Sequence, residues 1–249
     1  MVSIIYNDID TVSRNAYNYI ISASVTNQNA LNLVKVGKEL INSELPANLI
    51  EPAIFMSKHV SSKNVASFTV HAEGNWSSKA ELGGKPYTLS MSSPIEMLNV
   101  LIQMSKLAAP SMEVTFEATH HGPYTTKRSF FAEVGGNDDV IKNPKMAEIL
   151  AKSIISSLDM GNNSKKIAVG IGGNHYSSRF TKMALNDGYA FSHIMSRYYI
   201  TETDMLDQAF QMSYPKPEIA VIEWKSISSS ERLPIINKLE SMGIEYERV

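Results

Sequence analysis

Short apolar runs and longer amphipathic stretches alternate along most of the chain. Apolar runs of roughly four to eight residues are typical of buried strands, whereas apolar positions three and four residues apart mark one face of a helix. The pattern predicts strands over residues 2–6, 53–56, 67–71, 112–119, 130–134, 167–171, 219–224 and 244–249. It predicts helices over residues 9–24, 94–109, 146–158, 204–212 and 230–242. Residues 31–40 fit either element, and residues 189–200 are apolar and aromatic.

The order of these elements predicts the fold class. Strands and helices alternate, and the connections are long enough for parallel strand pairing. We therefore expect an α/β fold, in which a central mixed, largely parallel sheet is flanked by helices. No break in composition and no internal repeat divides the chain, so residues 1–249 are expected to form a single domain.

One long polar segment, residues 73–94, interrupts the alternation. It begins with Glu73-Gly74-Asn75-Trp76, passes through Gly83-Gly84-Lys85-Pro86 and ends where Ser93 and Pro94 suit the cap and first turn of a helix. Loops of this length inside a compact domain are uncommon and usually functional. We expect this segment to border a site and to act as a lid over it.

The composition is that of an ordinary globular protein, with 43% hydrophobic and 19% charged residues. No apolar stretch approaches the roughly 20 residues of a membrane helix. The first residues lack the features of a signal peptide, so a cytoplasmic protein is expected. The absence of cysteine excludes disulfides, thiolate metal sites and a cysteine nucleophile. Any bound metal must therefore use His, Asp, Glu or water.

The net charge of −2 and the isoelectric point near 6.3 do not resemble those of a nucleic-acid-binding module. The charge is nevertheless uneven. Residues 118–132 contain Lys127 and Arg128 and no acid, and residues 165–200 contain five cations against Asp187 alone. If these segments meet, they form a local basic face; otherwise they are scattered solvated side chains.

Two short stretches combine histidine with glycine at the ends of predicted strands. The first is His120-His121-Gly122-Pro123. Adjacent strand residues point to opposite faces, so one imidazole is expected to enter a site while the other packs elsewhere. Histidine can act as acid, base or metal ligand near neutral pH. The alternative is a pair of loop histidines with structural hydrogen bonds only.

The second stretch is Gly172-Gly173-Asn174-His175, which follows a buried strand but matches neither the P-loop nor the dinucleotide-binding pattern. It could equally be a tight turn. His175 and Arg179 would share one face if a helix began there. Elsewhere, His71 and His59 each end a strand, Glu133 faces either a site or solvent, and His193 fits a buried core histidine.

Four groups of residues together resemble the archaeal and plant type of D-aminoacyl-tRNA deacylase. In chain order they are Thr69–Trp76 with Ala80–Pro86; Thr119–Pro123 with Phe131–Gly135; Val169–Tyr176 with Arg179-Phe180-Thr181; and the region around His193. Each motif alone is weak, but four in register over most of residues 53–200 are specific. Two departures are Asn174, in place of a small or apolar residue, and Gly136-Asn137-Asp138-Asp139 after Gly135.

The resemblance implies an enzyme that hydrolyses the ester between a D-amino acid and the terminal ribose of tRNA. It also implies zinc as cofactor and a fold similar to peptidyl-tRNA hydrolases and phosphorylases. It does not fix which histidines bind metal. The alternatives are another tRNA-ester or nucleoside-cleaving hydrolase on the same fold, and a non-catalytic RNA-binding module. A monomer is expected.

Two mechanisms fit these residues. A zinc-bound water could attack the ester, with three protein ligands at most. Alternatively, the backbone N–H groups of Gly172 and Gly173 could hold the oxyanion while a histidine orients water. The expected catalytic residues are His120, His121, His175 and Glu133. The candidate metal ligands are His120, His121, His175 and His71.

The acceptor end of tRNA is the expected partner, held by aromatic rings and cations. Gly122 and Pro123 are expected to form the wall that excludes L-amino acids. The other expected substrate-binding residues are Asn75, Trp76, Lys127, Arg128, Gly172, Gly173, Asn174, Tyr176 and Arg179, with Tyr124 and Lys182 as further candidates.

Overall fold

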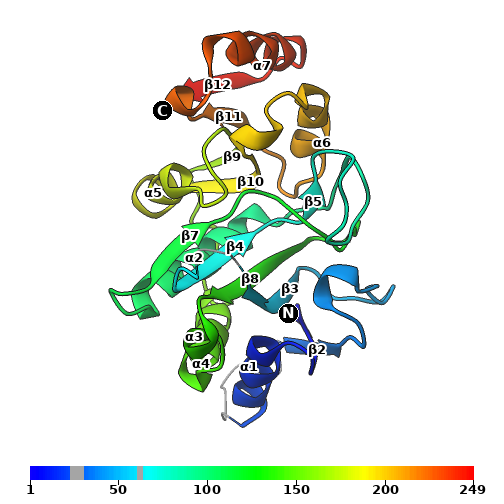
Figure 1. Cartoon of the computed structure of the whole chain (residues 1–249), viewed down its shortest axis with the longest axis vertical. Helices are drawn as coiled ribbons and strands as arrows, with labels where there is room; N and C mark the ends of the chain where they lie inside the picture. The colour runs from blue at the N-terminus through cyan, green and yellow to red at the C-terminus, as the bar shows by residue number, and fades with distance from the viewer. Residues whose placement is uncertain (23–30, 61–63) are drawn as a thin grey trace.

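Apart from one short two-stranded pair, the strands divide between two sheets that lie one above the other (Figure 1). The computed structural model describes residues 1–22, 31–60 and 64–249. The larger sheet has six strands in the order β2-β1-β3-β8-β4-β7. The strands are β1 (Val2–Tyr6), β2 (Leu31–Lys35), β3 (Ala53–His59), β4 (Ser67–His71), β7 (Glu113–Phe116) and β8 (Ser129–Gly135). All neighbours pair in parallel except β4 and β8, which are antiparallel.

Helices cover one face of the six-stranded sheet. They are α1 (Thr11–Ser22), α2 (Pro94–Leu107), α4 (Pro144–Ser157) and the short α3 (Asp138–Ile141). Every second residue of strand β8 points into the apolar core beneath these helices, and these residues, Phe130, Ala132 and Val134, are fully buried. The alternation sends Phe131, Glu133 and Gly135 to the opposite face, because successive strand residues point to opposite sides.

The smaller sheet has four parallel strands in the order β10-β9-β11-β12. The strands are β9 (Lys166–Ile171), β10 (Tyr189–Met195), β11 (Ile219–Ile222) and β12 (Glu245–Arg248). Its helices are α5 (Ser178–Asp187), α6 (Leu206–Gln211) and α7 (Ser229–Ser241), with 3-10 turns η3 (Arg197–Tyr199), η4 (Thr203–Met205) and η5 (Trp224–Ser226). One buried apolar cluster includes Phe116 of the first sheet and Phe191 of the second, whose rings lie 6.0 Å apart.

The two sheets are joined by the segment that follows β7. The N–H of Ala118 donates to His175 O at 2.8 Å, and the N–H of Thr119 donates to Ile194 O at 2.9 Å. On its other side, the N–H of Glu117 donates to Val70 O of β4 at 3.1 Å. Residues 117–119 therefore pair with both sheets, and His120 and His121 follow directly.

The α/β class and the largely parallel pairing predicted from the sequence are confirmed, whereas the division into two sheets goes beyond the prediction. The ambiguous residues 31–40 form β2 and begin the turn η2 (Leu40–Asn42). The helix expected over 9–24 spans 11–22, and residues 23 and 24 lie outside the described ranges. The polar segment 73–94 contains only the two-residue strands β5 (Gly74–Asn75) and β6 (Thr88–Leu89). The single-domain organisation stays a prediction.

None of the helices in the described ranges combines the length and the apolar character that crossing a bilayer requires.

Candidate functional site

Polar side chains gather on the face of the six-stranded sheet that the helices leave uncovered. Strand register places Phe55, Phe131 and His71 in one row across β3, β8 and β4, with stacked rings 4.5 Å and 5.3 Å apart. In the next row Glu133 lies opposite Ser57 on one side and opposite Thr69 on the other. The apolar row therefore ends beside a buried carboxylate.

Glu133 lies between two histidines of the neighbouring strands. Its Oε2 is 3.4 Å from His59 Nδ1 and 3.6 Å from His71 Nε2. Gly135 makes room for the His59 ring, because a Cβ there would lie 2.5 Å from Ser67 Oγ and 3.3 Å from His59 Cδ2. The β8 alternation thus answers the question left open by the sequence, since Glu133 faces this cluster and not solvent.

A second buried carboxylate, Glu117, comes from the joining segment. Its Oε1 is 3.2 Å from His59 Nδ1, and its Oε2 is 2.9 Å from His175 Nε2 and 3.6 Å from His120 Nε2. The side chain of Glu117 is fully buried, whereas 41% of the His175 side chain is exposed. Glu117 therefore links histidines of the first sheet to the loop that follows β9.

His120 and His121 both reach the cluster, contrary to the expectation that only one would. His121 has a left-handed backbone conformation, with φ of 46°, which breaks the strand alternation. The two imidazole centroids lie 4.3 Å apart, and those of His71 and His120 lie 4.2 Å apart. The prediction that one imidazole packs elsewhere is therefore wrong, because the strand has already ended.

Three of these histidines present Nε2 in the same way. The Nδ1 atoms of His71, His120 and His121 lie 3.1, 2.9 and 2.6 Å from the carbonyl oxygens of Ala72, Ala118 and Gly122. A carbonyl can only accept, so each Nδ1 carries the hydrogen and donates it. Such backbone contacts fix the tautomer and the ring orientation of metal-binding histidines.

Burial and charge act in opposite directions within the cluster. Burial lowers the pKa of His121 to about 4 and holds the pKa of His120 well below its usual value, and the charge of His71 adds to both effects. Burial also lowers the pKa of His71, but Glu133 and Glu117 outweigh it and raise that pKa to about 9. Conversely, burial raises the pKa of Glu133, but contacts with His59 and His71 bring it below its usual range.

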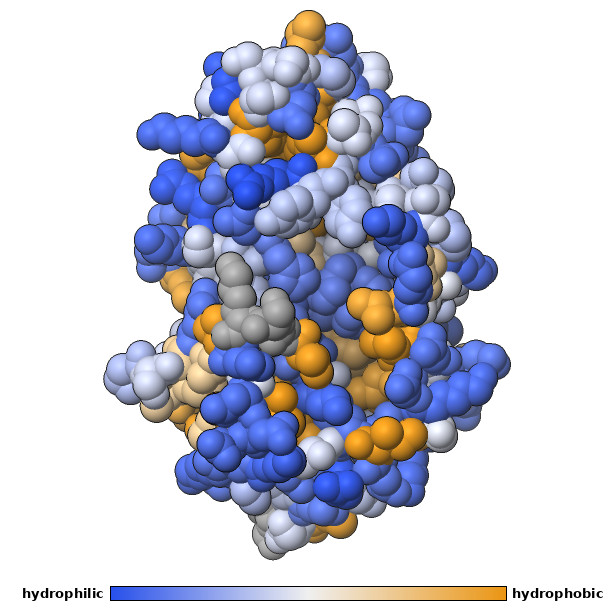
Figure 2. Space-filling model, viewed as in Figure 1, coloured by the Kyte–Doolittle hydropathy of each residue, from blue (hydrophilic) through white to orange (hydrophobic). Residues whose placement is uncertain are grey.

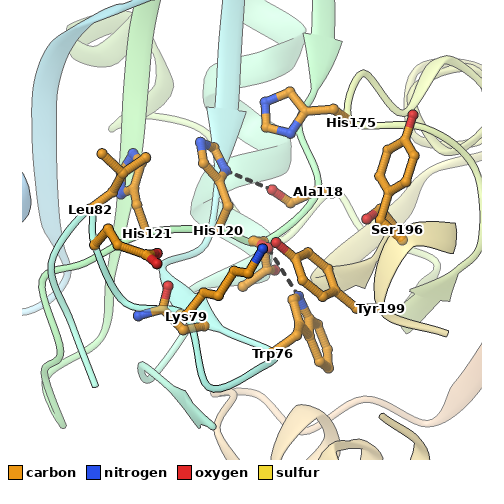
Figure 3. Close-up of a pocket in the computed structure, with 14 residues that line it drawn as sticks. Trp76, Lys79, Leu82, Ala118, His120, His121, His175, Ser196 and Tyr199 are labelled. Carbon is orange, nitrogen blue, oxygen red and sulfur yellow. Dashed lines mark hydrogen bonds between the residues drawn. The ribbon is translucent and has the colours of Figure 1, made fainter. Parts of the chain in front are cut away.

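A cavity of about 270 Å³ opens over the exposed side of the cluster (Figure 3). His120, His121 and His175 line it together, although His175 is far from the other two in the sequence. The remaining lining residues come from three places: residues 74–76, 79, 81 and 82 of the polar segment, residues 118 and 119, and residues 196, 198 and 199. The face shown in Figure 2 is hollowed near its middle, with hydrophilic side chains in the recess.

The polar segment borders the cavity as expected, but two of its residues differ from the expectation. Trp76 is only 1% exposed, and its Nε1 donates to Thr119 O at 3.0 Å. It therefore braces the histidine segment and cannot serve as an open stacking platform. Asn75 Nδ2 donates to Gly83 O at 2.8 Å, so this amide stabilises the segment itself.

The Gly172-Gly173 turn does not offer free backbone donors. The N–H of Gly172 donates to Met195 O at 2.8 Å, and that of Gly173 donates to Ser226 Oγ at 2.7 Å. The oxyanion hole considered above is therefore wrong for this turn. The expected helical spacing of His175 and Arg179 also fails, because α5 begins only at Ser178.

The predicted basic residues differ in their surroundings. Lys127 and Arg128 both pair with Glu51, at 3.3 and 3.4 Å, so their charges are partly neutralised. Arg179 and Lys182 are exposed on α5, and Asn174 is exposed beside His175. The ring centroid of Tyr176 lies 5.7 Å from that of His59 and 5.8 Å from that of His175. Lys85 Nζ lies over the Tyr124 ring, 4.2 Å from its centroid.

Gly122 and Pro123 lie beside the cluster in tightly packed backbone. The N–H of Gly122 donates to Leu82 O at 3.0 Å. A Cβ on Gly122 would lie 2.2 Å from Gly84 N and 2.5 Å from Ile41 O. The backbone here is therefore fixed on several sides.

Sequence reasoning missed two central residues, Glu117 and, in effect, His59. In the sequence, Glu117 is only one residue of a predicted strand, and His59 is only a strand end. The one available signal was that His59 and His71 each end a strand beside a polar segment. His193 is fully buried as expected, and its Nε2 lies 2.9 Å from Met212 O.

Several overlapping sets of these side chains could hold a metal ion. The sets are His59, Glu117, His120 and His175; His71, His120 and His121; and His71, Glu117 and Glu133, with ligand atoms within 4.8 Å of one another. Within the described ranges, His59 Nε2, His71 Nε2, Glu117 Oε1 and Glu133 Oε2 are buried and make no hydrogen bond of acceptable geometry. Buried polar atoms normally have partners, so this donor set fits a cation bound by nitrogen and oxygen.

Comparison with known proteins gives one consistent result. The sequence model of the D-aminoacyl-tRNA deacylase family matches residues 47–247. The chain is 38% identical over 194 residues to the D-aminoacyl-tRNA deacylase of Ignicoccus hospitalis, covering 77% of this chain and 78% of that protein. It is also 38% identical over 213 residues to that of Methanosarcina barkeri, covering 83% of this chain and 67% of that protein.

A crystal structure of a conserved protein of unknown function has the same fold, with a TM-score of 0.91 and 26% sequence identity. The superposition covers 100% of this chain and 95% of that one. The histidine-glycine motifs, the family model and the two archaeal relatives all indicate the same family, and the fold matches a solved structure. The chain belongs to the D-aminoacyl-tRNA deacylase family.

Proposed function

We propose that this chain hydrolyses the ester bond between a D-amino acid and the terminal ribose of tRNA, which removes wrongly charged tRNA before translation uses it. The family and the names of its relatives support the reaction. The observation that carries the proposal is the meeting of five of the six histidines with two buried glutamates beside one cavity. We further propose that the protein acts in the cytoplasm as a monomer.

We infer that zinc is the cofactor, and that His71, His120 and His121 hold it through Nε2. Their Nδ1–H groups already donate hydrogen bonds to backbone carbonyls, which leaves Nε2 as the ligand atom. Three histidine ligands leave an open position, as catalytic zinc sites do. When bound there, zinc polarises an ester carbonyl and acidifies a water molecule. The empty hydrogen-bonding capacity of His71 Nε2 supports this choice.

We assign His175 as the general base. It is the most exposed member of the cluster and lines the cavity. Glu117 Oε2 accepts a hydrogen bond from His175 Nε2 at 2.9 Å, which leaves Nδ1 free to take a proton from the attacking water. The same imidazole can then return the proton to the departing ribose oxygen. Glu133 lies beside His59 and beside His71 Nε2, where its carboxylate would balance the charge of His59 and of a cation held by His71.

D-selectivity is assigned to the fixed backbone at Gly122 and Pro123, which are not themselves among the cavity-lining residues but directly follow the cavity-lining His121. Discrimination between mirror-image substrates needs a wall that does not yield. The close packing of Gly122 against Gly84 N and Ile41 O supports such a wall, because backbone atoms cannot move aside as a flexible side chain can.

The direct test measures deacylation of one tRNA charged in parallel with D- and L-tyrosine. The expected result is fast release of the D-amino acid, little release of the L-amino acid, loss of activity with a chelator and recovery with zinc. Equal rates for the two substrates would favour a general ester hydrolase. Binding of tRNA without turnover of either substrate would favour an RNA-binding module. Full activity in metal-free protein would rule out the zinc assignment alone.

A further inference from the structure

The cavity has a second wall, opposite the histidines, that the hydrolytic residues do not use. Lys79 from the polar segment and Tyr199 from η3 extend toward each other across the cavity (Figure 3). Tyr198, the neighbour of Tyr199, also lines the cavity, yet 63% of its surface is exposed. This wall therefore combines an open aromatic ring with a lysine beside the proposed reaction centre.

The Gly172-Gly173 turn holds this wall in place. The N–H of Arg197, the first residue of η3, donates to Gly173 O at 2.9 Å. Gly173 has φ of 76°, and a Cβ there would lie 2.5 Å from Glu223 Oε2. The two glycines thus position η3 through backbone contacts, which gives them a structural reason to follow β9.

The charges around Tyr198 are not neutralised. Arg197 Cζ lies 5.4 Å from the centroid of the Tyr198 ring. Among the residues that the structure describes, neither Lys79 nor Arg197 has an acidic partner within 4.0 Å, although Glu81 borders the same cavity. Lys127 and Arg128 differ, since both pair with Glu51. Lys79 therefore brings an unpaired cation to the cavity itself, and Arg197 brings one to the ring of the cavity-lining Tyr198.

We propose that Tyr198, Arg197 and Lys79 bind the terminal nucleotide of the acceptor end, and that this wall guides the tRNA strand into the cavity. The inference rests on the proposed function for its partner. Proteins grip single-stranded RNA by stacking bases on aromatic rings and by placing Lys and Arg at phosphates. With Arg197 against one side of the Tyr198 ring, the terminal base stacks on the other side. Lys79 and Arg197 then contact the phosphate of the same nucleotide.

The orientation of the substrate follows from this assignment. The ester must lie at His175 and the zinc-binding histidines, so the ribose that carries it lies between the two walls. The amino acid then points toward Leu82, which lines the cavity from the polar segment and lies beside His121 in Figure 3. The nucleotide is thus held by η3 together with Lys79, and the amino acid lies against Leu82, which belongs to the same polar segment as Lys79.

The test compares Tyr198→Ala and Tyr198→Phe with a matched control, Tyr214→Ala. Tyr214 is 61% exposed and also carries an arginine, Arg128, 5.1 Å from its ring centroid, but it does not line the cavity. In steady-state deacylation of D-tyrosyl-tRNA, Tyr198→Ala should raise KM about tenfold or more and leave kcat unchanged. Tyr198→Phe should restore the wild-type KM, because the ring alone stacks.

A binding measurement separates this inference from the proposed reaction. Fluorescence anisotropy with an uncharged RNA oligonucleotide ending in CCA should show weaker binding for Tyr198→Ala, and a smaller salt slope for the pair Lys79→Gln with Arg197→Gln. If wild type binds the oligonucleotide through Tyr198 but hydrolyses neither charged tRNA, the proposed function fails and the nucleotide site stands. If wild type deacylates D-tyrosyl-tRNA and only Tyr214→Ala raises KM, the tRNA docks beside Arg128 and this inference is overturned.

Discussion

Glu117 contacts three histidines through its two carboxylate oxygens, so it fixes the relative positions of His59, His120 and His175. Its pKa is below the usual value, because contacts with His175 and His59 outweigh the raising effect of burial. An amide at this position keeps the shape but loses the charge. We therefore expect Glu117→Gln to lower kcat about 100-fold or more with little change in KM.

The matched control for that substitution is Glu113→Gln, at the exposed start of strand β7, which ends just before Glu117. It should leave kcat unchanged. Single-turnover deacylation of D-tyrosyl-tRNA measures both variants. A normal rate in Glu117→Gln would show that the charge of this carboxylate plays no part in the proposed base function.

His193 is a buried histidine outside the cluster, held between Met212 O and Thr119 Oγ1 at 2.9 and 3.2 Å. Burial lowers its pKa to about 4, from an ordinary value of 6.5. Between these values the unfolded chain binds a proton that the folded chain does not, so stability is lost as pH falls. From pH 7 to pH 5 this one group should cost about 2 kcal/mol of unfolding free energy.

The variant His193→Gln isolates this contribution. Urea unfolding of wild type and variant should differ in the size of their pH 7 to pH 5 loss, with the smaller loss in the variant. Equal losses would show that His193 is protonated in the folded protein or that the site opens readily.

At the level of single residues, the sequence revealed chemistry but not neighbours. His120, His121 and His175 stood out because each borders glycine. Glu117 did not, since its role depends on a contact with a histidine 58 positions later in the chain. The left-handed conformation of His121 was equally hidden, because strand alternation predicts the opposite placement of its side chain.

Within the polar segment, residues 74–89 are held in place by backbone contacts more than by strand pairing. Gly83, Gly84 and Gly122 cross so closely that an added Cβ on any of them would meet a neighbour at 2.9 Å or less. Asn75 fixes the same crossing through Gly83 O and Lys85 O. The glycines therefore serve close packing, and the lid motion expected from the sequence stays a prediction.

Gly83→Ala tests this crossing. Gly83 has φ of 80°, and a Cβ would lie 2.0 Å from Ile41 O. The substitution should lower the unfolding free energy by more than about 2 kcal/mol and raise KM, since left-handed strain and a backbone clash act together. Gly243→Ala is the control, because Gly243 has φ of 68° with nothing within 4 Å of an added Cβ.

Gly243→Ala should cost only about 1 kcal/mol, the strain of the left-handed conformation alone. Chemical denaturation of both variants gives the comparison. Equal costs would show that the crossing yields easily, and the wall assigned to Gly122 would then lose its rigidity.

Elements were the scale at which the sequence was most informative. Strand β1 was predicted over its whole length, and α2 begins at Pro94 as expected. Both signals are local, an apolar run and a proline at a helix start. The pairing of β4 against β8 was not predictable, because periodicity contains no information on which strands become neighbours.

The whole molecule joins its two sheets beside the histidine cluster, so metal binding and stability should be linked. Zinc at about 100 times its dissociation constant stabilises a folded protein by about 2.7 kcal/mol. For a chain of this size that corresponds to a rise in Tm of roughly 5–10 °C. Differential scanning calorimetry of metal-free protein with and without zinc should show this rise.

Two variants make the zinc measurement specific. His121→Ala should abolish most of the rise, because it removes one of the three proposed ligands. His193→Gln should retain it, since that histidine lies outside the cluster. A full rise in His121→Ala would move the metal to the set of His59, Glu117, His120 and His175.

The joining segment also sets the time at which the protein becomes competent during its own synthesis. Six of the seven cluster residues lie before residue 136 and leave the ribosome first. The N–H groups of Ala118 and Thr119 nevertheless cannot form their hydrogen bonds until the carbonyl groups of His175 and Ile194 have been synthesised. A nascent or truncated chain that stops before β10 contains most of the cluster residues. It lacks Ile194 of β10, which helps to fix the segment leading to His120 and His121. Ester-cleaving activity should therefore appear only once translation has passed residue 195, the end of β10. Until then, an incomplete active site on the growing chain does not hydrolyse charged tRNA.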